Sequence, residues 1–333
     1  MSDLRIDNIT DRTGSCGPVI SGVSTVSSTG AFTVPVGPTE MRGGRGRGVF
    51  GGAANPSYLN IIDYVEIATT GNATDFGDLK TGWYNMGGCA SSTRGIFFPG
   101  YDGSTLVNTI FYITVSSSGG VNDFGDTINV SNSHSGACND STRAVRAQGY
   151  TPAKTNLLEY ITIASTGDST EFGDLNRNSG ALAGSFSSPT RGFFGGGKTA
   201  TNIIDYVTIQ TRGDAKDFGD LQDARAEGTG AANTTRGIFF GGSEAGDTSK
   251  IQYITMATFG NAIDFGDLLE GLEAGGACAS STRGVHGGGT TPTKINVIQY
   301  VTIASTGNAI DFGDRTTTGF GVGSFSDTNG GLG

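Results

Sequence analysis

The chain has 333 residues, a formal net charge of −10, 57 glycines and only 21 lysines and arginines. An acidic chain with few basic residues is a poor partner for nucleic acid, because contact with phosphate requires a basic surface. The glycines do not recur at every third position and apolar runs separate them, which excludes a collagen-like or a disordered Gly-rich polymer.

Residues 1 to 46 do not share the repeat described below. Residues 3 to 10 and 31 to 36 alternate like short strands, but the segment is too small to bury a core of its own. We therefore expect an N-terminal attachment segment that docks on the rest of the chain, on copies of itself or on another protein. The only local basic cluster of the chain, Arg42, Arg45 and Arg47, lies where this segment meets the repeats, and we interpret it as a junction in preference to an RNA site.

The first residues lack the apolar core of a secretory signal, and no stretch approaches the ~20 apolar residues that span a bilayer. The sequence therefore predicts a protein made in a cytoplasm, with no signal peptide and no membrane insertion. Such a protein works outside a cell only if something other than secretion carries it there.

From residue 47 onward, one pattern recurs six times: a Tyr, ten further residues, and then Asp/Glu-Phe-Gly-Asp. The motif phenylalanines lie 46 to 48 residues apart, at Phe76, Phe124, Phe172, Phe218, Phe265 and Phe312. A period in the forties, with short apolar runs between turn residues, is typical of propellers and solenoids. We predict one domain over residues 47 to 333.

Each repeat accommodates four short strands, which we name A to D in chain order. Strand A consists of small residues, strand B is apolar and ends in Gly-Gly, strand C contains the Tyr, and strand D contains the Phe. Strands B and C are apolar on both faces, as in residues 203 to 209, which favours blades packed against neighbours on both sides. The small residues of strand A suit the crowded position beside the axis.

The two ends of the repeat region complement each other. Residues 324 to 328 match a strand A, such as residues 185 to 190, whereas residues 47 to 52 form a strand B with no strand A before it. Joined together, they complete one blade and leave no long exposed sheet edge. The sequence thus predicts an all-β, six-bladed propeller in which the C-terminal strand closes the ring.

One arginine per repeat occupies the turn between strands A and B, at Arg47, Arg94, Arg143, Arg191, Arg236 and Arg283. We interpret these arginines and the motif phenylalanines as a structural ring, with turn hydrogen bonds and Arg–Asp pairs joining neighbouring strands. The alternative is a Ca²⁺ loop, for which Asn72, Asp75 and Asp78 offer oxygen ligands. Because the spacing lacks dense alternating carboxylates, we favour the structural ring and predict no metal and no cofactor.

The cysteines and histidines also favour structural roles. Cys89, Cys138 and Cys278 share one register of the repeat, so we expect packing and no disulfide among them, while Cys16 stays unassigned. His286 stands in strand B where other repeats have Phe, which predicts a packed core histidine. With no metal-spaced Cys/His cluster and no nucleophile elbow, we predict that the protein is not an enzyme.

A Gly-Gly after strand B, an aromatic in strand C and another in strand D resemble the kelch repeat over residues 47 to 329. The repeats depart from that family in using Phe where kelch repeats usually have Trp, and in the imperfect pairs Pro99-Gly100 and Gln148-Gly149. The resemblance implies a kelch-like propeller. The cytoskeletal and ubiquitin-ligase roles of the family do not transfer, because no partner domain accompanies the repeats.

Residues 4 to 10, followed by Gly14, look like the opening of many virion structural and tail-fibre proteins of tailed phages. Residues 43 to 52 and 303 to 309 resemble virion proteins of phages that infect cyanobacteria. This resemblance implies a virion location and a fibre or appendage component, homo-oligomeric and joined to other virion proteins through residues 1 to 46.

In a four-stranded antiparallel blade, the A–B and C–D turns lie at one end, and the B–C and D–A connections lie at the other. The first pair is nearly uniform along the chain, whereas the second pair is diverse. Diverse loops on a rigid scaffold favour recognition, here of a host surface glycan or protein, although drift in unconstrained loops explains the diversity as well. The candidate ligand-binding residues are Trp83, Tyr84, Tyr101, Asp102, His134, Tyr150 and Glu244.

Trp83 beside Tyr84 is expected to stack on a sugar or to anchor a protein contact. Two alternatives stay open. One is a capsid or tail decoration protein with a purely structural role, and the other is a cellular kelch-type scaffold or lectin.

Overall fold

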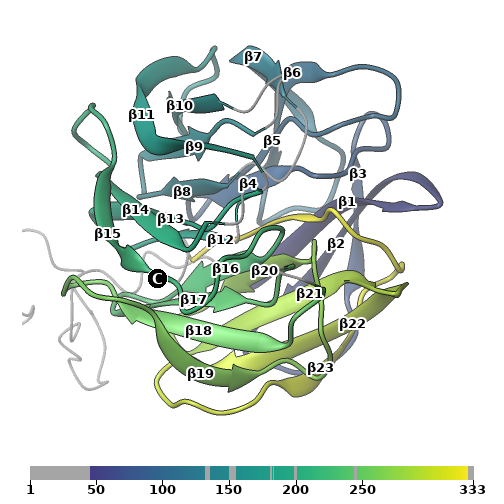
Figure 1. The fold of residues 1–333 in the computed structure, drawn as a ribbon. Coiled ribbons are helices and arrows are strands. Elements are labelled where there is room, and N and C mark those ends of the chain that lie inside the picture. The colour runs from purple at the N-terminus through teal and green to yellow at the C-terminus, as the bar shows by residue number, and fades with distance from the viewer. Residues whose placement is uncertain are drawn as a thin grey trace, which may run out of the picture. The chain divides into compact units, whose positions relative to one another are not determined.

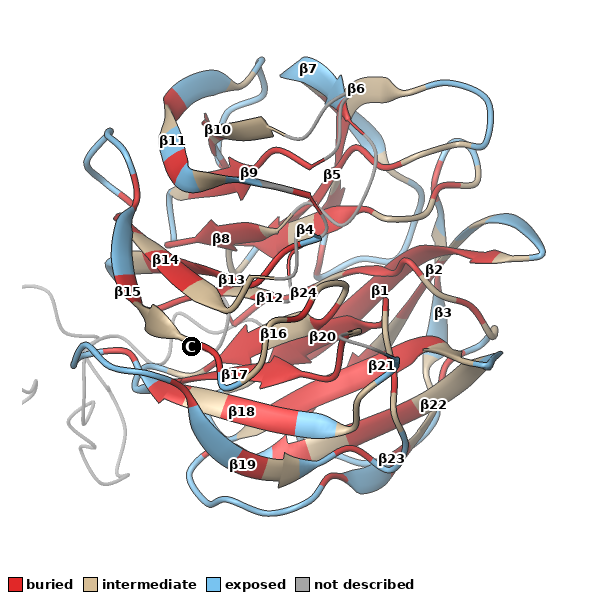
Figure 2. Cartoon of the chain, viewed as in Figure 1, coloured by how far each residue is buried: buried red, intermediate tan, exposed pale blue. Residues whose placement is uncertain are grey.

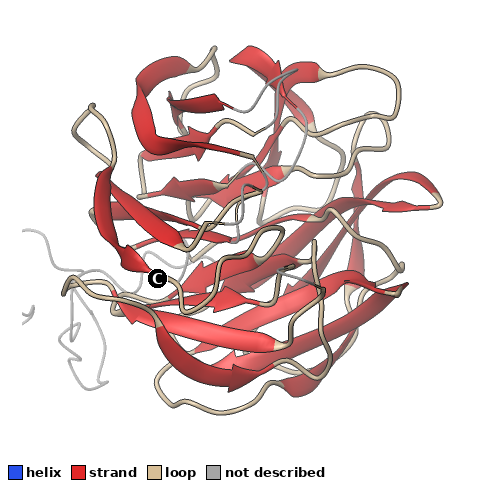
Figure 3. Cartoon of the chain, viewed as in Figure 1, coloured by secondary structure: helices blue, strands red, loops and turns tan. Residues whose placement is uncertain are grey.

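The computed structural model describes residues 46–328, apart from residues 132–135, 150–154, 181, 183, 199–200 and 244–245. Strands and loops make up the described part of the chain, which contains no helix (Figure 3). The strands form six four-stranded antiparallel sheets arranged as the blades of a ring (Figure 1). The predicted six-bladed β-propeller is confirmed.

We number the blades I to VI and give their strands from the axis outward. Blade I consists of β24 (Gly323–Ser326), β1 (Arg47–Asn55), β2 (Ser57–Glu66) and β3 (Thr74–Asp78). Blade II consists of β4 (Gly87–Ala90), β5 (Arg94–Phe98), β6 (Val107–Thr114) and β7 (Asn122–Ser131). Blade III consists of β8 (Ala137–Asn139), β9 (Arg143–Ala147), β10 (Thr155–Thr162) and β11 (Thr170–Ser179).

The second half of the ring repeats this order. Blade IV consists of β12 (Gly184–Ser187), β13 (Arg191–Gly195), β14 (Ile203–Thr208) and β15 (Lys216–Asp220). Blade V consists of β16 (Thr229–Ala232), β17 (Arg236–Phe240), β18 (Lys250–Thr255) and β19 (Ile263–Asp267). Blade VI consists of β20 (Gly276–Ala279), β21 (Arg283–Thr291), β22 (Thr293–Thr302) and β23 (Ile310–Asp314).

The two ends of the propeller meet in blade I. Strand β24 pairs antiparallel with β1, from Gly48 opposite Ser326 to Gly51 opposite Gly323. Just beyond β24, the Asp327 carboxylate accepts hydrogen bonds from the backbone N–H groups of Gly46 (3.1 Å) and Arg47 (2.9 Å). The predicted closure of the ring by the C-terminal strand is therefore confirmed.

The inner strands surround a small central cavity of about 100 Å³. Its lining comes from β4, β8, β12, β16, β20 and β24, and most of these residues are Gly, Ala, Ser or Cys. Small side chains are needed there because six strands converge on one axis. Hydroxyl groups also link neighbouring inner strands, as where Ser187 donates to the Asn139 carbonyl (2.7 Å). Strand A is thus innermost, as the sequence predicts.

The hydrophobic core lies between the blades (Figure 2). One cluster, for example, joins Val49 and Ile62 of blade I to Phe97 and Phe111 of blade II, and five similar clusters follow around the ring. Because each cluster needs two blades, no blade buries its apolar side chains alone, which is why strands B and C are apolar on both faces.

The repeated Phe-Gly of strand D fixes how each blade meets the next. Each motif Phe is buried, and its ring lies 5.8 to 6.1 Å from the ring of the motif Tyr in the same blade. The following glycine, such as Gly77, has a positive φ of 148°, and a Cβ there would collide with the Gly119 carbonyl of blade II. The Gly119 N–H in turn donates to the Phe76 carbonyl (2.8 Å). The motif therefore lets the outer strand of one blade hydrogen-bond to the C–D turn of the next.

Candidate ligand-binding face

We call the end of the propeller with the A–B and C–D turns the uniform face, and the opposite end the variable face. On the uniform face, each repeat arginine lies over the motif Tyr of its own blade, with 4.4 to 5.1 Å between the guanidinium carbon and the ring centroid. Its Nη1 also donates to a carbonyl of the next blade, as from Arg94 to Ile163 (2.9 Å). The same contact recurs in every blade, from Arg47 to Val115, Arg143 to Ile209, Arg191 to Met256, Arg236 to Ile303 and Arg283 to Ile67.

This geometry corrects one expectation. Among the described ion pairs, none joins a repeat arginine to a motif aspartate, and the arginines bridge blades through carbonyl groups instead. The Arg–Asp pairs do not form because the guanidinium is held over the Tyr ring, whereas aspartates such as Asp75 and Asp78 are exposed on the outer strand.

Asn72, a candidate Ca²⁺ ligand, accepts a hydrogen bond from the Asp314 N–H of blade VI through its side-chain oxygen (3.1 Å). Within the described ranges, no three His, Cys, Asp or Glu residues are grouped so that they could share a metal ion.

The three described cysteines and the described histidine are buried. Cys89, Cys138 and Cys278 are free thiols beside the axis, and burial raises their pKa values well above that of an exposed cysteine. His286 is 1 % exposed in strand β21, and burial lowers its pKa to about 4. These environments keep both the thiols and the imidazole neutral, as packing residues require.

A ring of buried side chains lies beneath the variable face. The residue before each motif Tyr is buried in every blade: Asp63, Phe111, Glu159, Asp205, Gln252 and Gln299. Apart from Phe111, each accepts a hydrogen bond from the backbone N–H that lies two residues past the Asp-Phe-Gly-Asp motif of the preceding blade. The donors are Thr316, Ile128, Asn176, Gln222 and Leu269. These contacts hold neighbouring blades together at this end.

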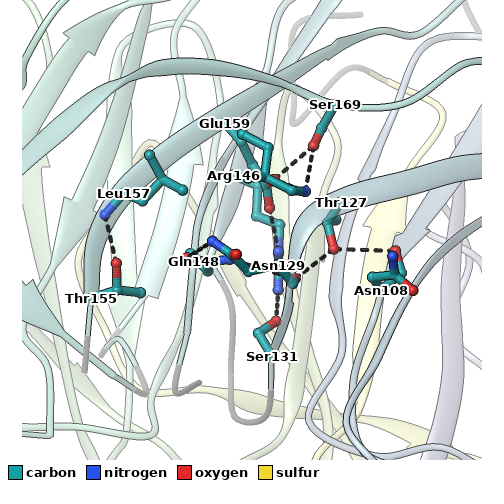
Figure 4. A network of polar contacts seen from close by, with 11 residues as sticks. Asn108, Thr127, Asn129, Ser131, Arg146, Gln148, Thr155, Leu157, Glu159 and Ser169 are labelled. Carbon is teal, nitrogen blue, oxygen red and sulfur yellow. Dashed lines mark hydrogen bonds and ion pairs between the residues drawn. The ribbon is translucent and has the colours of Figure 1, made fainter. Parts of the chain in front are cut away.

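The three carboxylates of this ring pair with arginines. Asp63 pairs with Arg315 (3.2 Å), Asp205 with Arg177, and Glu159 with Arg146. Figure 4 shows the third pair, in which Arg146 also donates to Ser131, and Ser169 donates to Glu159 (2.7 Å). Burial raises the pKa of Asp205, and the Arg177 charge opposes that shift. This ring was not predicted, although five of the six motif tyrosines follow a polar residue in an otherwise apolar strand.

Blade II replaces the polar contact with an aromatic one. The Trp83 ring stacks on Phe111 with 4.8 Å between centroids, and Lys80 Nζ lies 5.1 Å from the Phe111 centroid. Trp83 is only 3 % exposed. Its expected role as a surface for stacking on a ligand is therefore corrected, because the indole is buried against Phe111.

Four D–A connections each contribute one residue to what we call the entrance ring, which lies above the ring of buried side chains. Its members are Glu227, Ala274, Gly321 and Asn85, in the connections that lead into blades V, VI, I and II. Each has a positive φ of 56° to 74°. The Ala274 N–H donates to Glu227 (2.6 Å), the Gly321 N–H to Ala274 (2.6 Å), and the Asn85 N–H to Gly321 (2.7 Å), in each case to the carbonyl. Four successive blades are thus linked by backbone hydrogen bonds close to the axis.

The residue before each member of the entrance ring forms an isolated bridge with the end of strand B or with the B–C connection of its blade. The bridged pairs are Ala226 with Ser243, Glu273 with Thr290, Phe320 with Ala54, and Tyr84 with Tyr101. These positions are equivalent in the fold but differ in chemistry. At the entrance ring, the half beside blades I and II carries aromatic residues, and the half beside blades V and VI carries acidic residues.

The aromatic half, which we call the aromatic patch, consists of Tyr58, Tyr84, Tyr101 and Phe320. Tyr58 stacks on Tyr84 at 5.1 Å between centroids, Tyr101 lies edge-on to both at 5.9 Å, and Phe320 lies 5.7 Å from Tyr84. Tyr58 is 38 % exposed and the other three are half-buried. Burial raises the pKa of Tyr84, and Tyr58, Tyr101 and Glu227 contribute to the shift.

The structure brings the predicted residues Tyr84 and Tyr101 together. Tyr58 and Phe320 were missed, because Tyr58 reaches Tyr84 from the adjacent blade I and only ring closure brings Phe320 there.

The Asp102 carboxylate, another candidate, forms its hydrogen bonds within its own loop. One carboxylate oxygen accepts hydrogen bonds from the backbone N–H groups of Thr105 and Ser104, each at 2.8 Å. The Thr105 contact is the main reason that the pKa of Asp102 is lowered. Asp102 therefore stays ionised and holds the loop that carries Tyr101. The candidates His134, Tyr150 and Glu244 lie outside the described residues.

The acidic half, which we call the acidic cluster, consists of Glu227, Asp247 and Glu273. Ser243 is common to all three, since its backbone bridges Asp247 and Ala226, the neighbour of Glu227, and its hydroxyl donates to Glu273. Burial raises the pKa values of Asp247 and Glu273, with repulsion from Glu227 as the next cause. Lys198 pairs with Glu227 at 3.2 Å.

Neither the family models nor the curated protein sequences gave a match to this chain. No helix in the described part of the chain has the length and apolar character that crossing a membrane requires.

Proposed function

We propose that this protein is a non-enzymatic structural component of a phage virion, in a fibre or another appendage, and that its variable face adheres to the host surface. A six-bladed β-propeller is compatible with an adhesion or a scaffold role. In this proposal, residues 1 to 46 join the propeller to other virion proteins, and several copies assemble in one appendage.

The contrast between the two faces supports adhesion. The arginine contacts of the uniform face recur in all six blades, whereas equivalent positions at the entrance carry Tyr84, Ala226, Glu273 and Phe320. Such differences suit recognition of a ligand, because each position then meets a different part of it. This contrast is the observation that carries the proposal.

The assignment to a virion depends on the sequence alone. It rests on the resemblance of residues 4 to 10, 43 to 52 and 303 to 309 to virion proteins of phages. Adhesion and particle association are therefore separate parts of the proposal, and each needs its own test.

Particle association is tested by immunogold labelling of purified phage with an antibody against the propeller. Label at fibre or baseplate tips is the expected result. Label spread over the head or tail shaft would point to decoration, and particles without label would overturn the virion assignment.

Adhesion is tested by adsorption of fluorescent full-length protein to host cells, with Tyr58→Leu compared with Phe259→Ala. Phe259 is 60 % exposed in a C–D turn, so its loss serves as a control for an aromatic side chain outside the aromatic patch. Reduced adsorption of Tyr58→Leu alone is expected. Equal adsorption of both variants would remove the aromatic patch from the proposal.

A further inference from the structure

The aromatic patch and the acidic cluster lie at one mouth of the central cavity, because the residues that follow Glu227, Ala274, Gly321 and Asn85 all line that cavity. We call this mouth the opening. The entrance ring runs from Glu227 through Ala274 and Gly321 to Asn85. Along it, Glu273 of blade VI, Phe320 of blade I and Tyr84 of blade II occupy equivalent, successive positions. A ligand centred on this opening therefore meets carboxylates on one side and aromatic rings on the other.

Among the described residues, the three carboxylates of the acidic side face the single charge of Lys198, which pairs with Glu227 and also acts on Glu273. Among the described ion pairs, none involves Asp247 or Glu273, and Glu227 pairs with Lys198, which is exposed. A further described lysine at the entrance, Lys294, lies 5.3 Å from the Phe320 ring centroid. On the aromatic side, Asp102 adds a further carboxylate beside Tyr101. The opening thus favours a cationic ligand over an anionic one.

The aromatic side also favours a positively charged ligand. The face of a tyrosine ring carries negative electrostatic potential and attracts ammonium and guanidinium groups. On the uniform face, every motif Tyr already holds a guanidinium at 4.4 to 5.1 Å. Tyr84 stacks on the Tyr58 ring, but Tyr58 is 38 % exposed as a residue and still has surface available to a ligand.

The size of the aromatic patch favours a small ligand group over a protein surface. Three of its four rings are half-buried by one another and by the loops, and Gly103 lies directly against Tyr58. A stable protein interface buries roughly 800 Å² on each partner, far more than these rings expose. A sugar ring matches the aromatic patch better, because its C–H face stacks on a single aromatic side chain.

We propose that the opening bordered by the aromatic patch and the acidic cluster binds a saccharide that carries a free amino group. The sugar ring stacks on the tyrosine side, and the ammonium group faces Glu273 and Asp247. This inference rests on the proposed adhesion function and names the chemical class of its ligand.

The test is calorimetric titration of the full-length protein with two oligosaccharides of equal length, a glucosamine oligomer and its N-acetylated form. Acetylation removes the positive charge and keeps the sugar ring. We expect the glucosamine oligomer to bind at least about tenfold more tightly, a difference of about 1.4 kcal/mol. Its affinity should fall as salt concentration rises, because the contact is partly electrostatic.

Two variants test the two halves of the opening. Tyr58→Leu keeps the bulk but removes the aromatic face, and Glu273→Gln removes a negative charge at nearly constant shape. Each variant should weaken binding of the glucosamine oligomer by about tenfold. The matched controls are Phe259→Ala and Asp264→Asn, which alter an exposed aromatic and an exposed carboxylate in the outer part of blade V. These controls should bind like the unaltered protein.

Three outcomes would overturn the inference. Equal affinity for the acetylated oligomer would show that the protein does not recognise the ammonium charge. The proposed adhesion function would then still be compatible with binding of neutral glycans. Binding unaffected by both variants would place the site elsewhere. A lysine-rich peptide that competes with equal affinity would indicate a general cation site. The cell-adsorption assay judges adhesion separately, so failure of this inference is distinguishable from failure of the proposed function.

Discussion

The two ends of this propeller are built from the same six repeats, yet they join the blades in different ways. On the uniform face, each junction uses the same arginine, tyrosine, glycine and backbone groups. Beneath the variable face, the junctions use Asp–Arg and Glu–Arg pairs, glutamines, and in blade II Phe111 with Trp83.

This difference shows which contacts the fold requires. A contact made largely of backbone groups depends on glycine and on close approach, so one solution serves all six junctions. A contact made by side chains in a space of fixed size has several solutions, provided that buried polar groups find partners. The variable face can therefore change its chemistry without loss of the ring. The predictions below test that distinction, from the largest expected effect to the smallest.

Breaking a buried pair beneath the variable face should have the largest effect. Arg315→Met leaves Asp63, which is 0 % exposed, without its cationic partner. We expect the free energy of unfolding to fall by about 3 to 5 kcal/mol, measured by urea denaturation. The double variant Asp63→Leu/Arg315→Met should recover part of this loss, since blade II already tolerates an apolar side chain at the position of Asp63.

The control for this prediction is Lys198→Met, which removes an exposed partner of Glu227. Its expected cost is below about 1 kcal/mol. A loss for Arg315→Met as small as that of the control would mean that Asp63 is not held as a buried charge.

On the uniform face, a single methyl group should weaken one junction. In Gly266→Ala, the new Cβ would collide with the Gly307 carbonyl of blade VI, and the residue has a φ of +146°. We expect a loss of about 3 kcal/mol, measured by urea denaturation.

Gly307→Ala is the matched variant in the same junction. Gly307 has a φ of +156°, but a Cβ there would have open space around it. It should cost only about 1 kcal/mol, from backbone strain. Equal losses in the two variants would show that conformation, and not close approach between blades, explains the repeated glycine.

His286 should make stability depend on pH. Its folded pKa of about 4 lies below the ordinary value of 6.5, so the unfolded chain binds the proton first as the pH falls. The contribution of His286 to stability is complete above about pH 6.5, and it declines progressively as the pH falls toward 4. At pH 5 the loss should be about 2 kcal/mol relative to neutral pH.

The comparison variant is His286→Phe, which copies blade V, where Phe239 stands opposite Gln252 as His286 stands opposite Gln299. Thermal unfolding at pH 5 and pH 7 should show a smaller difference for this variant than for the unaltered protein. An unchanged pH dependence would assign the effect to other groups.

The smallest effect is expected from Arg283→Lys on the uniform face. Lysine keeps the charge, but it loses the planar group that lies 4.6 Å from the Tyr300 centroid and donates to the Ile67 and Ala68 carbonyls, each at 3.0 Å. The expected loss is about 1 kcal/mol by urea denaturation. Arg212→Lys, at an exposed arginine 5.8 Å from the Tyr160 centroid, should change stability less. Equal losses of stability in Arg283→Lys and Arg212→Lys would show that the Arg283 guanidinium contributes nothing to stability beyond its charge.

Much of the candidate site could be located from the sequence, but its composition could not. The diversity of the D–A and B–C connections identified the variable face, and Tyr84 and Tyr101 lie together there. Trp83 was assigned to the surface because loop position does not reveal the direction of a side chain, and its ring instead fills a space beside Phe111. Glu227, Asp247 and Glu273 were missed because they come from three different connections that the fold brings together around Ser243 and the entrance ring.

The sequence by itself determined the number of blades, the four strands of each and the closure of the ring. These features repeat every 46 to 48 residues, and repetition turns a weak local pattern into a strong one. Only the tertiary structure decided which residues meet between blades, and it placed Tyr58 and Phe320 beside Tyr84. The physical reason is that these contacts are made across the ring closure and between adjacent blades, where proximity depends on the geometry of the whole ring and not on distance along the chain.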